Sequence, residues 1–290
     1  MSTTTTTKAG RLPDATRLGV AHLQVSSMER SLRYYRDFLG FALLQTDGAT
    51  ATLAAHDDER ALLVLHEKPG ATPVPRRGRL GLFHFAILLP DRAALGRFAA
   101  HLARMGAPAG SSDHLVSEAI YLQDPDGLGI EVYADRPRSA WQHLPSGEIA
   151  MATEPLDVAS LLRAAGDAPW TGMPRGTVMG HVHLHVGDLR EAEAFYADAL
   201  GFDVVVRGYP GALFVSAGGY HHHLGLNTWA AHAVPAGDDD ARLLEWTVVL
   251  PSSDDIDAAL ERMRAAGTEV SDGALLRDPW GTALRLVAAS

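Results

Sequence analysis

The sequence predicts an α+β fold of four βαβββ modules arranged as two tandem domains. The main observation is an internal repeat: GVAHLQVSSMERSLRYYRDFLGF (19–41) returns as GHVHLHVGDLREAEAFYADALGF (180–202) in the same register. A looser copy relates residues 82–107 to residues 243–268. The second observation is that strand-like and helix-like periodicities alternate within each copy. Four units that open in the same way indicate a duplicated chain with two modules in each half.

Each predicted module begins with a short strand of period-2 alternation. These first strands are centred on His22, His84, His183 and Glu245. An amphipathic helix follows, as in MERSLRYYRDFLG, where Gly40 is placed to end the helix. Short strands separated by turns such as DPDG and DPWG complete the module.

The repeat sets the predicted domain boundaries. Residues 1–15 are polar and threonine-rich, and we expect a disordered tail. Residues 16–139 form an N-terminal metal-binding domain, and residues 177–290 form a C-terminal domain whose metal site is degenerate. Residues 140–176 belong to neither half and read as a connection with one short helix, VASLLRAAG.

Composition excludes several functions. At 290 residues and 47% hydrophobic, the chain can bury one large core or two medium ones. A net charge of −10 argues against nucleic acid as a partner, because phosphate binding requires a basic surface. The absence of cysteine removes disulfides, thiolate metal sites and cysteine nucleophiles. With no secretory signal and no long apolar run, we expect a cytoplasmic protein that does not span a membrane.

Three side chains are predicted to converge on a metal. If the first and last strands of paired modules line one concavity, the inward candidates in the N-terminal half are His22, His84 and Glu131. A strand carboxylate such as Glu131 is costly to bury unless a cation meets its charge. Two imidazoles and one carboxylate form a facial set that leaves about three positions open, which suits non-haem Fe(II). Any one of these residues alone would more often be structural.

The C-terminal half serves as an internal comparison. His183 corresponds to His22, but Glu245 replaces His84 and Arg285 replaces Glu131. Arginine stays protonated and cannot ligate a metal, so we predict that this half has lost the site. The half is still rich in histidine, and we interpret these residues as structural rather than as a second metal site. They are His181, His183, His185, His221, His222 and His223.

A longer motif connects these residues to a known family. His114-x5-Ile120-Tyr121-x2-Asp124-Pro125-x-Gly127-x3-Glu131 resembles the fingerprint of extradiol ring-cleaving dioxygenases. With the four modules, the chain resembles the vicinal oxygen chelate superfamily, which also includes glyoxalases and bleomycin-resistance proteins. Within it, the chain is most similar to two-domain catechol-2,3-dioxygenase-like proteins.

The resemblance implies a reaction. A catechol-like aromatic would bind with O2 at Fe(II), or at Mn(II) or another divalent metal, and the ring would open. His22, His84 and Glu131 would be ligands, while His114 and Tyr121 would be catalytic residues beside the substrate oxygens. The family also carries a catalytic histidine on later strands. His56 and His66 do not fall cleanly at that place, whereas YHHHLGLNTW (220–229) in the other half resembles it.

Two alternatives stay open on the same scaffold. A glyoxalase-type isomerase or a resistance transferase would carry a fourth protein ligand, at a position where this chain has Val64. A non-enzymatic protein that sequesters an aromatic ligand would commonly lack a complete ligand set. The substrate's ring substituents and the oligomeric state stay open too, with a homo-oligomer among the options.

Overall fold

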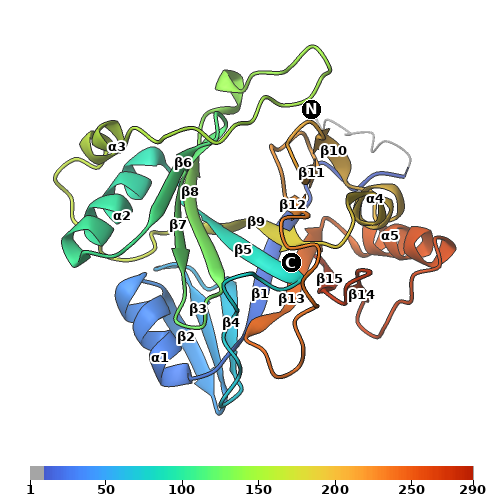
Figure 1. The fold of residues 1–290 in the computed structure, drawn as a ribbon, viewed down its shortest axis with the longest axis horizontal. Helices are drawn as coiled ribbons and strands as arrows, with labels where there is room; N and C mark the ends of the chain where they lie inside the picture. Colours follow the sequence, from blue (N-terminus) through green and yellow to red (C-terminus); the bar gives the residue numbers. More distant parts are fainter. Residues whose placement is uncertain (1–9, 290) are drawn as a thin grey trace.

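The computed structural model describes residues 10–289, which form two large mixed β-sheets with helices packed on their outer faces (Figure 1). The first module comprises β1 (Arg17–Val25), α1 (Met28–Leu32) with a π-helix (Arg33–Phe38), β2 (Ala42–Asp47), β3 (Thr50–Ala54) and β4 (Ala61–Glu67). The second comprises β5 (Gly81–Leu88), α2 (Arg92–Met105), β6 (Gly110–Asp113), β7 (Ser117–Gln123) and β8 (Gly129–Asp135).

The second half repeats this order. The third module comprises β9 (Val178–His185), α4 (Leu189–Glu193) with a π-helix (Ala194–Ala199), β10 (Asp203–Val206), β11 (Ala212–Ser216) and β12 (Leu224–Asn227). The fourth comprises β13 (Arg242–Leu250), α5 (Ser253–Ala265), β14 (Leu275–Arg277) and β15 (Ala283–Ala288). It has two strands after its helix instead of the predicted three, because an isolated bridge between Ser271 and Leu275 takes the place of a strand.

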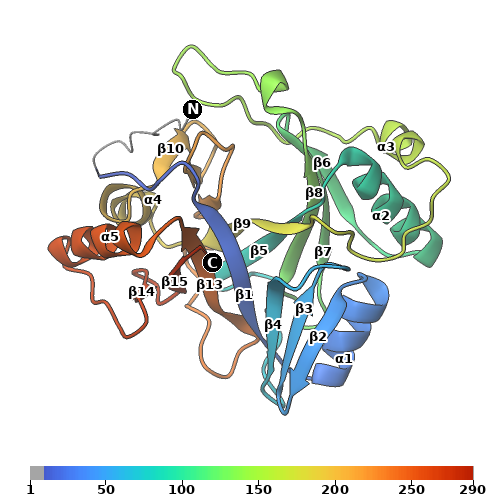
Figure 2. The same cartoon turned by 180° about the vertical axis from the view of Figure 1, so that it is seen from behind.

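The modules pair across the two halves of the chain. The seven-stranded sheet has the order β14-β15-β13-β1-β4-β3-β2, so it joins the first and fourth modules. The eight-stranded sheet has the order β10-β11-β12-β9-β5-β8-β7-β6, so it joins the second and third. Figure 2 shows β1 beside β13, with β5 and β9 together in the other sheet. The α+β fold is confirmed, but neither sheet is built from one half alone as the predicted boundaries imply.

Two buried aspartates of the DP turns fasten neighbouring modules together. Asp124 accepts hydrogen bonds from the amides of Asp126 (2.9 Å) and Leu128 (2.8 Å), which close its turn. Its other oxygen accepts the Tyr35 hydroxyl of the first module at 3.0 Å. In the second half, Asp278 accepts the Tyr196 hydroxyl in the same way, also at 3.0 Å. The repeated turn therefore both shapes a strand connection and anchors the preceding helix.

The segments outside the modules are packed against them. Residues 1–9 of the predicted tail lie outside the described residues, but residues 10–15 are ordered against the third module. Leu12 is buried, and its amide donates to the Gly201 carbonyl at 2.8 Å. The connection contains a 3-10 turn (Arg138–Ala140) and α3 (Val158–Ala164), which confirms the predicted short helix. Within residues 10–289, none of the helices has the length and apolar character needed to cross a membrane.

Candidate metal centre

Three central strands of the eight-stranded sheet bring His84, Glu131 and His181 together. Ala86 on β5 lies in register with Glu131 on the parallel strand β8 and with His181 on the antiparallel strand β9. Residues in register share a face of the sheet, and His84 lies two positions from Ala86 on that same face. The small, buried Ala86 side chain leaves the space above it to the three larger ones.

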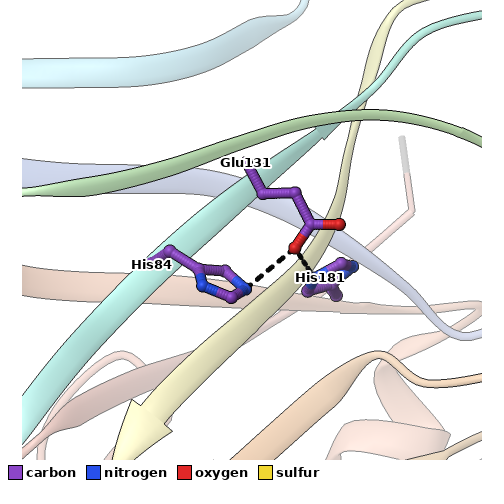
Figure 3. Close-up of side chains that lie close together, drawn as sticks. All are labelled: His84, Glu131 and His181. Carbon is purple, nitrogen blue, oxygen red and sulfur yellow. Dashed lines mark hydrogen bonds and ion pairs between the residues drawn. The ribbon is translucent and has the colours of Figure 1, made fainter. Parts of the chain in front are cut away.

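The donor atoms of these side chains lie close together (Figure 3). Oε2 of Glu131 lies 3.0 Å from Nε2 of His84 and 3.1 Å from Nε2 of His181. The three ligand atoms all lie within 4.8 Å of one another, and all three residues are buried. Among residues 10–289, this is the one cluster of at least three potential ligands with that geometry.

The electrostatics of the cluster fit a bound cation. Nε2 of His84 approaches the carboxylate without hydrogen-bond geometry, and it is a buried nitrogen with no hydrogen-bond partner among the described residues. Burial lowers the pKa of His84, which favours the neutral imidazole that a metal requires. Burial opposes ionisation of Glu131, but His181 and His84 together hold the pKa of this carboxyl well below its ordinary value. A divalent ion would meet the charge of the carboxylate without a proton on His84.

His22 is not part of this cluster, so the prediction that it is a ligand is wrong. It lies on β1 in the seven-stranded sheet, opposite Glu245 on β13 and beside Val64 on β4. Its Nδ1 is 3.0 Å from Nε2 of His66. Because β1 pairs with β13 and β5 pairs with β9, the third ligand comes from β9 as His181. Residues 16–139 therefore do not hold the site by themselves.

The corresponding position of the seven-stranded sheet is closed by an ion pair. Nε and one terminal nitrogen of Arg285 donate to the two carboxylate oxygens of Glu245, at 2.6 and 2.8 Å. The guanidinium thus supplies the positive charge beside Glu245, and no metal is needed there. That the set containing Arg285 has lost its metal stays a prediction.

His114 and Tyr121 form a hydrogen-bonded pair next to the cluster. Nδ1 of His114 donates to the Ala152 carbonyl at 2.7 Å, since a carbonyl can only accept. In the neutral ring Nε2 is then an acceptor, and it receives the Tyr121 hydroxyl at 2.6 Å. Burial raises the pKa of Tyr121 well above its ordinary value, which keeps the phenol protonated. Tyr121 lies opposite Glu131 in the β7–β8 pairing, so the pair borders the cluster directly.

A cavity of about 300 Å³ opens over these residues. Its walls are largely aromatic and include Phe83, Phe214 and Trp229. Met151, Ala152 and Thr153 of the connecting segment also line it. The volume lies at the lower end of the range for small-molecule sites and suits a ligand of about one aromatic ring.

A family profile covers most of the chain. The profile of the Glyoxalase/Bleomycin resistance protein/Dioxygenase superfamily matches residues 17–132 and again residues 178–284. The chain belongs to this superfamily. The two matches fall in the two halves of the chain, as expected from the internal repeat.

Individual members of the superfamily are also similar. The chain is 50% identical over 260 residues to the catechol-2,3-dioxygenase of Bacillus subtilis (strain 168), covering 89% of this chain and 90% of the relative. A solved protein of Bacillus subtilis subsp. subtilis str. 168 has a TM-score of 0.63 at 13% identity, covering 94% of this chain and 85% of that one. Glyoxalase I from Zea mays has a TM-score of 0.54 at 18% identity, covering 94% and 92%. The two structures support the fold alone.

Two histidines of the candidate site, His181 and His222, were not predicted from the sequence. Both His181 and His222 were expected to be structural, although the segment YHHHLGLNTW resembles the place of a catalytic histidine. His222 lines the cavity, and its ring centroid lies 4.1 Å from that of His181. Burial lowers the pKa of His222 well below its ordinary value, so it is a neutral imidazole. The sequence signal for His181 was its alternation with His183 and His185, because alternate residues of a strand such as β9 lie on one face of the sheet.

The neighbouring His183 and His185 have a shared hydrogen-bonding partner. The side-chain amide of Asn227 donates to Nε2 of His183 at 3.0 Å. Nδ1 of His185 donates to the side-chain oxygen Oδ1 of Asn227 at 2.7 Å. Burial lowers the pKa of both imidazoles. Burial thus keeps both rings neutral, and one asparagine fixes both beside the cluster.

His223 should make the protein sensitive to acid. Burial lowers its pKa to about 3, and its Nδ1 accepts the Ala217 amide at 3.2 Å. Between pH 6.5 and 3 the unfolded chain binds one proton more than the folded chain at this residue, so stability rises with pH. Between pH 7 and 5.5, this residue should remove about 1 kcal/mol of unfolding free energy.

The matched variant is His223→Asn, whose side-chain oxygen can replace the Nδ1 acceptor but does not titrate. Urea unfolding of the metal-free proteins at pH 7 and pH 5.5 measures the difference. Equal losses of stability in the two proteins on acidification would show that His223 does not contribute.

Proposed function

We propose that this protein is an extradiol dioxygenase that uses Fe(II) and O2 to open the ring of a catechol-like aromatic. The observation that carries the proposal is the buried His84–Glu131–His181 cluster at the base of an aromatic-lined cavity. Two imidazoles and one carboxylate on one face of a metal are typical of non-haem Fe(II) oxygenases. The 50% identity to a catechol-2,3-dioxygenase over 89% of the chain supports the same reaction.

His84, Glu131 and His181 would hold the metal. When bound, Fe(II) supplies a Lewis acid for the two catechol oxygens and a site at which O2 is activated. The protein contributes a largely aromatic cavity and a neutral imidazole at His84, whose pKa is lowered by burial. The aromatic side chains of Phe83, Phe214 and Trp229 pack around the substrate ring and exclude water.

Tyr121 and His114 handle a substrate proton on one side of the cavity. The Tyr121 hydroxyl donates to Nε2 of His114, so the lone pairs of its oxygen are free to accept from a substrate hydroxyl. As that proton reaches the Tyr121 oxygen, the phenolic proton passes to Nε2 of His114. The Ala152 carbonyl holds the His114 ring in place through Nδ1. These two residues keep the catalytic roles that the fingerprint implies.

His222 provides a second acid–base group from the third module. Its Nδ1 is bonded to His221 at 2.8 Å, and no hydrogen bond to its Nε2 occurs among the described residues. His222 lines the cavity, so this nitrogen can take or return a proton there. Its place within the YHHH segment (220–223) resembles that of the catalytic histidine implied by the family resemblance.

Among residues 10–289 no fourth ligand joins the cluster of His84, Glu131 and His181, which favours an oxygenase over an isomerase. Val64, which occupies the position where a glyoxalase-type enzyme would carry a fourth ligand, lies on β4 in the other sheet. In the eight-stranded sheet, β8 is the neighbour of β5, and β12 is the equivalent neighbour of β9. A ligand equivalent to Glu131 would therefore lie on β12. Gly225 lies opposite His183 there and has no side chain, and Asn227 is engaged by two histidines. Open metal positions remain for the substrate and O2.

Anaerobic loading tests the function. The metal-free protein would be given one equivalent of Fe(II), Mn(II) or Zn(II) and then a panel of catechols in aerated buffer. We expect the Fe(II) protein to yield the yellow ring-opened semialdehyde, and the redox-inactive Zn(II) protein to yield none. Isomerisation of a hemithioacetal without ring cleavage would instead assign the site to the glyoxalase type.

A further inference from the structure

Hydrogen-bonded side chains connect His222 in the candidate active site to Asp135 at the molecular surface, through His221. Nδ1 of His222 lies 2.8 Å from Nδ1 of His221. Nε2 of His221 lies 2.8 Å from a carboxylate oxygen of Asp135. The side chain of His221 is fully buried, whereas that of Asp135 is 25% exposed. Asp135 is the last residue of β8, four positions beyond Glu131.

Hydrogen-bonding rules give these contacts one direction. An ionised carboxylate only accepts, so Nε2 of His221 must donate to Asp135. The His221 tautomer that carries its proton on Nε2 has a bare Nδ1, which accepts from Nδ1 of His222. His222 is left with a proton on Nδ1 and a free lone pair on Nε2. Each step follows from the preceding partner, so the surface carboxylate determines which nitrogen of His222 is available to the cavity.

We propose that Asp135 and His221 are positioning residues that fix the tautomer and ring orientation of His222, leaving its Nε2 as the proton acceptor in the cavity. This inference rests on the proposed function for the role of that acceptor. The fixed tautomer itself follows from the contacts alone. Carboxylate–histidine pairs that orient a third group are a recurrent way of preparing a base for catalysis.

A second set of contacts on Asp135 offers a matched control. The Tyr220 hydroxyl donates to the same Asp135 oxygen at 3.3 Å and lies 2.6 Å from the Tyr133 hydroxyl. Neither tyrosine hydroxyl forms a hydrogen bond with Nδ1 of His222 or with either ring nitrogen of His221. Tyr220→Phe therefore removes a bond to Asp135 but leaves the His221–His222 link intact.

The first test is independent of turnover. Nitrogen NMR of the metal-free protein, labelled in its histidines, reports which ring nitrogen of His222 carries the proton. We expect Nδ1–H in the wild type and in Tyr220→Phe. We expect a mixture of tautomers in His221→Phe, and a return to Nδ1–H in His221→Asn, whose amide oxygen can accept that proton. A wild-type His222 protonated on Nε2 would overturn the proposal, whatever the enzyme's activity.

The second test uses the Fe(II)-loaded enzyme. His221→Phe should lower kcat by about 10- to 100-fold with little change in KM and iron content, since orienting partners of this kind typically contribute that much. His221→Asn should recover most of kcat, and Tyr220→Phe should lie within about 2-fold of the wild type. Equal kcat values in His221→Phe and the wild type would show that His221 does not act through His222. A wild type with the Nδ1–H tautomer but no ring cleavage would contradict the proposed function instead.

Discussion

Replacing His181 with alanine should strip the metal from the protein and lower turnover by at least about 10³-fold, or roughly 4 kcal/mol of activation free energy. The residue supplies one of only three protein donors, and its Nε2 lies 3.1 Å from the Glu131 carboxylate. Removing it leaves His84 and Glu131, which cannot hold Fe(II) on a complete facial set. Metal analysis after anaerobic loading, combined with steady-state rates, measures both effects.

The matched control is His22→Ala. His22 is also a histidine on the first strand of a module, but it lies in the seven-stranded sheet beside His66. We expect this variant to keep one metal per chain and near wild-type turnover. If His22→Ala lost the metal and His181→Ala kept it, the site would lie in the first module and the pairing of modules described above would not explain it.

Replacing His114 with phenylalanine should lower kcat by about 10²–10⁴-fold while iron content and KM stay close to wild type. The variant removes the acceptor of the Tyr121 hydroxyl, which lies 2.6 Å from Nε2, but leaves the three metal donors untouched. Because the pair acts on a proton that moves in the transition state, the loss should appear in kcat as well as in kcat/KM. Tyr121→Phe should be strongly non-additive with it, since both residues act on one proton.

Two further measurements separate catalysis from structure at His114. The exposed His143, in the connecting segment that also contains Ala152, provides a control substitution to phenylalanine outside the cavity lining. Melting temperatures of both variants show whether loss of the 2.7 Å bond to Ala152 destabilises the fold. A His114→Phe protein with lower Tm but near wild-type kcat would leave His114 with a structural role only.

The sequence was sufficient to predict the modules and to single out two of the three residues of the candidate metal cluster. The βαβββ periodicity and the DP turns are local signals, and His84 and Glu131 belong to one module, in which β5 and β8 are adjacent strands. The third ligand depends on which module supplies the neighbouring strand. All four first strands carry the same apolar alternation, so the sequence contains no local signal that decides whether β5 pairs with β1 or with β9.

The polar residues around the site were predictable to different degrees. The fingerprint located His114 and Tyr121 because their spacing within the second module is fixed. The roles of His181 and His222 depend on β9 meeting β5, and the Asp135–His221 contact joins residues 86 positions apart in the chain. In the other sheet, the replacement of a ligand by Arg285 was readable from residue type, since a guanidinium cannot ligate a metal.

The position of the bound metal tests the proposed centre most directly. Anomalous diffraction at the iron edge from crystals of the anaerobically Fe(II)-loaded protein should show one peak per chain, in bonding contact with His84, Glu131 and His181. A peak beside His22 and His66, or one peak in each sheet, would contradict a single centre built from both halves of the chain.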